Sequence, residues 1–211
     1  FNYLALLGWS PGDGRELMTR AEMIEAFSFD RVQASPARFD MTKLLWMNGE
    51  YMRRLPPAER LEGHLRDLRA HGLDPEPAEL LRVLEVMQDR IKVFSDTAAQ
   101  TRYFFTEDYP VDEGAWRKRV ARAGVPEALE ELRRRWANTA EWTAASLETV
   151  LKATAADLQR PAADLIHAVR IAVSGIPTGP GLFAMLEVLG RERVLGRLNR
   201  TIERASSAIA P

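Results

Sequence analysis

The apolar residues of this chain recur at alternating steps of three and four, and this spacing limits the fold more than any other feature. Such a stripe covers one face of an α-helix, whereas a strand needs alternation with a period of two. Sustained runs with a period of two are missing. The sequence therefore predicts an all-α fold. The clearest stripes expected in the core are Leu129, Leu132 and Trp136, and then Leu147, Val150, Leu151 and Leu158.

Capping residues and prolines mark where the helices begin and end. Thr19 and Asn138 are each followed three residues later by glutamate, as in a capping box, and Asp40 is a further N-cap candidate. The pair Pro56-Pro57 forces a break in the helical pattern. We place one boundary there and a softer one near Val111, where Ala, Leu and Arg become more frequent. The predicted domains are residues 1–55, 56–111 and 112–211.

Composition excludes several classes of protein. A chain of 211 residues with 46% apolar content can bury a sizeable core. It has no cysteine, and its three histidines are scattered, so we expect neither disulfides nor a metal site. No apolar run approaches the roughly 20 residues that span a bilayer. The formal net charge is −1, but the part from Arg160 onward carries seven Arg against four Asp and Glu, a net charge of +3.

Three polar features are candidates for ligand contacts, and each also has an ordinary explanation. Arg90 lies on a predicted helix, about 80° from the centre of an apolar stripe, where a solvated charge is common. The segment 174–181 is rich in Gly and Pro and predicts a stiff turn, with Pro180 at the first position of the next helix. The stripe beside Arg90 is Leu80, Leu84, Met87, Ile91 and Phe94.

The third feature is a row of arginines on one face of the last helix. The opposite face carries Val194, Leu195, Leu198 and Ile202. These arginines could reach phosphates, or they could form the solvated face of an amphipathic helix. The run Arg133-Arg134-Arg135 follows Glu130 and Glu131, which predicts two pairs at a spacing of four on a solvated face. The row on the last helix consists of Arg193, Arg197, Arg200 and Arg204.

Four blocks occur together in an order and spacing typical of one family: Asn2–Ser10, Phe39–Tyr51, Tyr103–Pro110 and Arg170–Gly190. Together they resemble the C-terminal half of bacterial glutamyl-tRNA synthetase, a class I enzyme, over essentially the whole chain. The resemblance implies a helical stem-contact segment, followed by an α-helical-cage anticodon-binding domain of two helical subdomains. It also implies a cytoplasmic monomer whose partner is tRNA for glutamate.

The catalytic signatures of that family are not found in these residues. They are a His-x-Gly-His-like motif and a Lys-Met-Ser-Lys-Ser-like loop, which handle ATP and the adenylate. We therefore expect no catalytic residue here, no glutamyl adenylate, and no cofactor in this chain. ATP and Mg²⁺ would bind the catalytic domain of the parent enzyme. The start at Phe1 rather than Met also indicates a truncated chain.

The resemblance also assigns contacts to individual residues. Arg90 falls where the family places the arginine that inspects the third anticodon base, cytosine in tRNA for glutamate and guanine in tRNA for glutamine. A guanidinium only donates, so it should attract the acceptors of cytosine and clash with the donors of guanine. Trp46 is implied as a stem contact, with a core position as the alternative. The other implied anticodon contacts are Lys152, His167, Arg170, Gly179, Pro180, Leu182 and Phe183.

Three departures and one rival function accompany this interpretation. Ser174 replaces a Thr that is common in relatives. His167 and Gly179 stand where relatives can carry Gln and Thr, so backbone contacts of the loop are safer expectations than side-chain contacts at these positions. The rival is an all-helical protein-interaction module whose grooves bind partner helices without RNA. Salt should separate the two, because contacts to phosphates weaken as salt rises and an apolar groove responds little.

Overall fold

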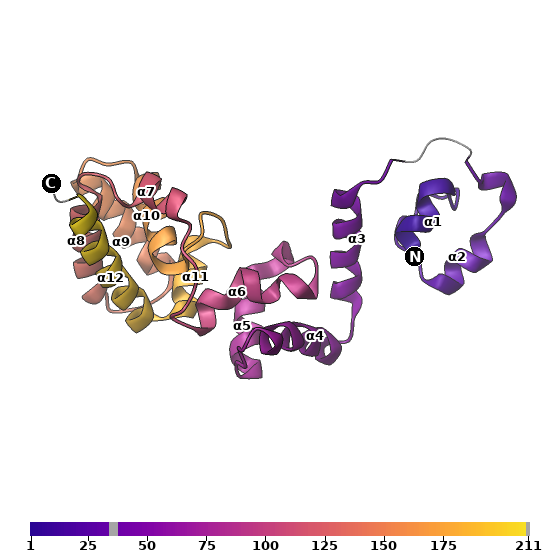
Figure 1. The fold of residues 1–211 in the computed structure, drawn as a ribbon, viewed down its shortest axis with the longest axis horizontal. Helices are drawn as coiled ribbons and strands as arrows, with labels where there is room; N and C mark the ends of the chain where they lie inside the picture. Colours follow the sequence, from indigo (N-terminus) through magenta and orange to yellow (C-terminus); the bar gives the residue numbers. More distant parts are fainter. Residues whose placement is uncertain (34–37, 210–211) are drawn as a thin grey trace. The chain divides into compact units, whose positions relative to one another are not determined.

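The computed structural model describes residues 1–33 and 38–209, and this part of the chain is helical, with one isolated bridge between Trp9 and Val32 (Figure 1). The predicted all-α class is confirmed. The chain divides into two compact units, Phe1–Arg60 and Leu61–Pro211. The finer division into three domains stays a prediction.

The first unit contains helices with capped N-termini and a small apolar core. The predicted cap at Thr19 is confirmed, since its hydroxyl accepts the Glu22 N–H at 3.2 Å, and Asp40 caps its helix in the same way. Trp9 packs with Met18 and Met23 in the core of this unit. The elements are α1 (Asn2–Gly8), α2 (Arg20–Ala26), the 3-10 turn η1 (Phe29–Arg31) and α3 (Met41–Arg54).

The second unit carries the remaining helices. In it α12 packs against α8, α10 and α11, while α5 contacts α11 and α6 contacts α10. The elements are α4 (Pro57–Ala70), whose first turn belongs to the first unit, α5 (Pro77–Met87), η2 (Gln88–Arg90), η3 (Phe94–Asp96), α6 (Thr97–Phe105), α7 (Glu113–Arg119), α8 (Val125–Ala137), α9 (Ala144–Asp157), α10 (Ala162–Ser174), α11 (Leu182–Leu189) and α12 (Arg191–Ile209).

The predicted core stripes lie where α8 meets α9. Their fully buried members are Leu129, Leu132, Trp136, Leu147 and Leu151. Trp136 also donates its indole N–H to the Leu147 carbonyl at 3.2 Å, so its polar atom is satisfied inside the core. The expectation was wrong for Leu158, which is 38% exposed because α9 ends one residue earlier.

Asn138 closes a helix instead of opening one, so the predicted second capping box is wrong. Its backbone N–H donates to the Arg135 carbonyl, and its side-chain amide donates to the Arg134 carbonyl at 2.8 Å. The next helix starts at Thr143, whose hydroxyl accepts the Ser146 N–H. An asparagine side chain can accept from the free N–H groups at the start of a helix or donate to the free carbonyls at its end, and Asn138 donates to the carbonyls.

The helix before Arg90 ends earlier than its apolar stripe predicts. α5 stops at Met87, and Gln88 then adopts a φ of 49°, which breaks the helix and begins the turn η2. Ile91 is nevertheless buried, so the apolar spacing continues through the break. Arg90 therefore lies at the end of a 3-10 turn, with its side chain exposed.

Candidate nucleic-acid interface

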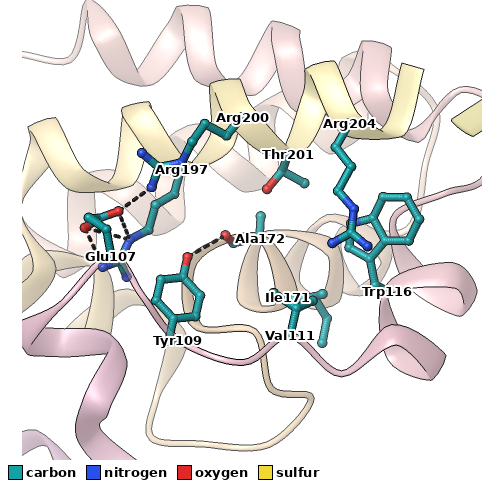
Figure 2. A pocket seen from close by; sticks show the side chains of 10 residues that line it. All are labelled: Glu107, Tyr109, Val111, Trp116, Ile171, Ala172, Arg197, Arg200, Thr201 and Arg204. Carbon is teal, nitrogen blue, oxygen red and sulfur yellow. Dashed lines mark hydrogen bonds and ion pairs between the residues drawn. The ribbon is translucent and has the colours of Figure 1, made fainter. Parts of the chain in front are cut away.

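The arginines of α12 bind the connector between α6 and α7. Arg197 and Arg200 pair with Glu107, Arg204 pairs with Glu113, and Arg193 reaches Glu79 and Glu107. Of these groups, Glu107, Arg197, Arg200 and Arg204 line a cavity of about 180 Å³ (Figure 2). We call Arg193, Arg197, Arg200 and Arg204 the α12 arginine row. Because its charges are matched by carboxylates, the basic C-terminal third is not a free cationic surface.

Arg197 is the buried member of the α12 arginine row and is 1% exposed. Its guanidinium donates to Glu107 at 2.7 Å, to the Thr106 carbonyl at 3.1 Å and to the Val173 carbonyl at 2.5 Å. It also lies 4.5 Å from the centroid of the Tyr109 ring (Figure 2). For this residue the alternative of a solvated face is wrong, since its hydrogen-bond donors join α12 to α10 and the connector.

The α12 arginine row predicts a pH dependence of stability. Hydrogen bonds from Arg197, and secondarily from Arg200, hold the pKa of Glu107 below its usual value. A carboxylate with a lowered folded pKa adds stability above the unfolded pKa of about 4.5, and this is lost as pH falls through the folded pKa. In urea titrations from about pH 6 to about pH 3, the stability gap between native protein and Glu107→Gln should shrink.

The control for this titration is Glu203→Gln, which removes an exposed carboxylate from α12, the helix that carries the arginine row. It matches the change in net charge without touching Glu107. A gap between native protein and Glu107→Gln that stays constant over the titration would contradict the role given to Glu107.

The charge run of α8 is paired mostly on its own helix, and Arg135 also pairs with Asp157 of α9 at 2.6 Å. Arg133 pairs with Glu130 at 2.7 Å, while Arg134 and Arg135 both pair with Glu131, at 2.8 and 2.6 Å. Of the two expected pairs at a spacing of four, the one between Glu131 and Arg135 is confirmed, and Glu130 instead uses a spacing of three. This run therefore offers no uncompensated row of cations.

The loop between α10 and α11 is fixed by glycine at its first residue. Gly175 has a φ of 74°, and a side chain there would begin 2.2 Å from the Pro110 carbonyl oxygen. Its own carbonyl accepts the Asp112 N–H at 2.7 Å. Pro180 lies two residues before the start of α11, with Gly181 as the N-cap, so its predicted place inside the helix is wrong. The first residue of the loop is thus held firmly against the connector between α6 and α7.

Arg170 ties the two ends of this loop together. It lies on the last turn and a half of α10, and its Nη2 donates to the Pro180 carbonyl at 2.8 Å. Its Nη1 is buried and has no hydrogen-bond partner. A side chain on Gly179 would begin 2.9 Å from that Nη1, so the glycine leaves room beside it. Arg170 has an unused donor beside the loop.

Tyr103 of α6 places a second unused polar group beside Gly179. Its side chain is 2% exposed, and its hydroxyl is buried without a hydrogen-bond partner. The hydroxyl oxygen lies 3.9 Å from the point where a Gly179 side chain would begin. Burial raises the pKa of the Tyr103 phenol above its ordinary value, so the hydroxyl keeps its proton. No sequence pattern marks Tyr103 as a site residue.

Arg90 adds a second cation to this group. Its charge acts on both Tyr103 and Arg170, and burial together with Arg90 lowers the pKa of Arg170. Within the described residues, neither Arg90 nor Arg170 pairs with a carboxylate. Like charges held near each other without a counter-charge cost free energy in the isolated chain. The structure therefore brings Arg170, Gly179 and Pro180 together with Tyr103, and the charge of Arg90 acts on this group.

The remaining expected contacts surround this group or lie apart from it. His167 is half-buried and precedes Arg170 by one turn of α10, whereas Phe183 is half-buried and Leu182 is buried at the start of α11. Lys152 is exposed on α9 and pairs with Glu148 at 2.6 Å, with no described contact to this group. Trp46 is 38% exposed on α3 in the first unit, so the alternative of a core tryptophan is wrong.

A search of the described residues finds no cluster of three or more His, Asp or Glu side chains suited to a metal ion. In the same part of the chain, no helix has both the length and the apolar character needed to cross a membrane.

Fold and site together define an all-α protein with an interhelical loop beside an arginine that no described carboxylate pairs with. The model of the family described as the anticodon binding domain matches residues 56–202. The chain belongs to this anticodon-binding domain family. A glutamate–tRNA ligase of Thermus thermophilus is 41% identical over 203 residues, and the one from Moorella thermoacetica is 39% identical over 207 residues.

These matches cover nearly all of this chain but less than half of each relative. They span 95% of the chain and 43% of the Thermus protein, and 94% and 42% for the Moorella protein. Among solved structures, a glutamate tRNA ligase from Elizabethkingia meningosepticum superposes with a TM-score of 0.80 and covers 96% of this chain and 40% of its own. Its sequence identity of 24% supports the fold alone.

Proposed function

We propose that this chain recognises the anticodon of tRNA for glutamate as one part of a glutamate–tRNA ligase. One observation supports this most directly: Arg170 lies beside the 174–181 loop with a buried Nη1 that has no hydrogen-bond partner, the charge of Arg90 acts on it, and no described carboxylate pairs with either arginine. The α12 arginine row is the contrast, because it has more charge but its carboxylates compensate it. Uncompensated donors beside an interhelical loop suit the splayed bases of an RNA loop.

Arg90 is proposed to select the third anticodon base. Its exposed side chain makes no hydrogen bond within the described residues, so all its donors remain available. Cytosine presents acceptors at O2 and N3 of its pairing edge, whereas guanine presents donors at N1 and N2. Cytosine would accept from Arg90 and guanine would oppose it. The arginine would thus favour tRNA for glutamate over tRNA for glutamine.

The other assignments complete this proposal. The loop residues Gly179 and Pro180, together with Phe183, would contact further anticodon bases, and His167 and Lys152 would extend the surface. The half-exposed ring of Trp46 would contact the tRNA stem. Glutamate activation, with its ATP and Mg²⁺, would take place in the part of the longer relatives that this chain does not match.

A salt titration tests whether this chain binds tRNA at all. We expect the binding constant for tRNA of glutamate to fall steeply and linearly on logarithmic axes, by about 0.7 to 0.9 per phosphate contact. Fluorescence anisotropy with labelled tRNA measures this slope. A DNA hairpin of matched length measures the part of the affinity that does not depend on base sequence.

Two results of the titration would contradict the proposal. Binding that is absent at low salt would remove RNA recognition from this chain. Binding that does not change with salt would favour the interaction-module alternative, since apolar contacts respond little to ionic strength.

A further inference from the structure

We propose that Tyr103 is a specificity-determining residue: its hydroxyl and Arg170 Nη1 together receive an acceptor edge of one anticodon base beside Gly179. This inference rests on the proposed RNA recognition and adds a residue to it. It places the bound base at the 174–181 loop, separate from the third base assigned to Arg90.

The first support is the state of the two polar atoms. The Tyr103 side chain is only 2% exposed, and its hydroxyl has no partner. Arg170 Nη1 is also buried without a partner. A buried donor without a hydrogen bond is costly, and such groups are rare in folded chains. Two such donors beside Gly179 indicate that an acceptor from a bound molecule completes their hydrogen bonds.

The second support is the position of Gly179. A side chain there would begin 2.9 Å from Arg170 Nη1 and 3.9 Å from the Tyr103 hydroxyl oxygen. Both atoms therefore lie next to the position that the side chain of any other residue would occupy at Gly179. Since the loop covers both atoms, it has to shift for them to reach a base. Pro177 and Thr178 beside them are exposed, which leaves this part of the loop open to RNA.

The third support is chemical. Arg170 only donates, and the Tyr103 hydroxyl is protonated, so the pair offers adjacent donors. A base edge with adjacent acceptors, such as O2 and N3 of cytosine, satisfies both donors. A guanine edge presents donors and leaves both unsatisfied, which is the condition that gives polar sites their selectivity.

Tyr103→Phe tests the hydroxyl alone. The first and second anticodon bases of tRNA for glutamate are replaced by guanine one at a time, and binding is measured at fixed low salt. We expect native protein to prefer the unchanged base at one of these positions. Tyr103→Phe should lose roughly two- to tenfold of that preference, while its preference at the third base stays as in native protein.

Tyr109→Phe is the matched control, because the Tyr109 hydroxyl donates to the Ala172 carbonyl at 3.4 Å and lies outside the proposed contact. It should leave every base preference unchanged. The melting temperature gives a second readout. Tyr103→Phe should not lower it, because the lost hydroxyl had no partner in the folded chain.

Gly179→Ala and Gly181→Ala test the space beside the donors. The first places a methyl group 2.9 Å from Arg170 Nη1 and should displace that guanidinium, weakening binding several-fold. The second meets no atom within 4 Å and should bind as native protein does.

The possible outcomes distinguish a failure of the role proposed for Tyr103 from a failure of the proposed RNA recognition. If native protein discriminates and Tyr103→Phe discriminates equally at both positions, the role of Tyr103 is wrong and anticodon recognition stands. A loss that is equal for all RNA sequences would place the contact on a phosphate and overturn base selection. If native protein binds no tRNA, both proposals fail.

Discussion

Arg90→Gln should abolish most of the preference for cytosine over guanine at the third anticodon position. A good bidentate contact is worth about 1 to 3 kcal/mol of discrimination, so the preference should fall roughly tenfold to hundredfold. Glutamine both donates and accepts, so it opposes neither base. The measurement is the ratio of dissociation constants for tRNA of glutamate and its cytosine-to-guanine variant, at one fixed low salt concentration.

Arg82→Gln is the matched control for this ratio. Arg82 is an exposed arginine of the helix that leads to Arg90, so its replacement makes the same change in charge. It should leave the ratio unchanged. The salt slope adds a check: a base contact leaves it nearly unchanged, whereas a lost phosphate contact lowers it by about one. Equal binding of both RNAs by native protein would show that Arg90 reads no base.

Arg197→Ala should destabilise the second unit by roughly 2 to 4 kcal/mol. The change empties a fully buried space and leaves the carbonyls of Thr106 and Val173 without their donor. Glu107 is half-exposed and can regain water, which keeps the expected cost below that of stranding a fully buried charge. Urea unfolding followed by circular dichroism measures the free energy of unfolding.

Arg200→Ala provides the comparison, because Arg200 pairs with the same carboxylate but is 58% exposed. An exposed pair contributes about 0 to 1 kcal/mol, so this variant should unfold near the native midpoint. Equal losses for the two variants would mean that the ion pair, and not the buried carbonyl contacts of Arg197, stabilises this part of the fold.

The features predictable from the sequence are those set by neighbours along the chain. The cap at Thr19 needs only Glu22, and the stripe ending at Trp136 needs only helical spacing, and both hold in the structure. The charge run of α8 also pairs within its own helix. The family resemblance, carried by several spaced blocks, agrees with the anticodon-binding domain match.

Other features depend on contacts between distant residues. The break at Gln88 has no glycine or proline to mark it, and Ile91 beyond it remains buried, so the apolar spacing conceals the change of direction. The α12 arginine row looks the same in sequence whether it is free or paired, because Glu107 lies far away along the chain. An unsatisfied hydroxyl such as that of Tyr103 has no sequence signature.

The pairing of the α12 arginine row has a consequence for how fast tRNA arrives. Cations that are neutralised in place project little field into solvent, and the whole chain has a net charge of only −1. Such a surface does not steer a polyanion over long distances, so encounters should be slow compared with those of strongly basic RNA-binding proteins. Under the proposed function, selection should then depend on how long each tRNA stays, and a tRNA with the wrong anticodon should leave soon after it arrives.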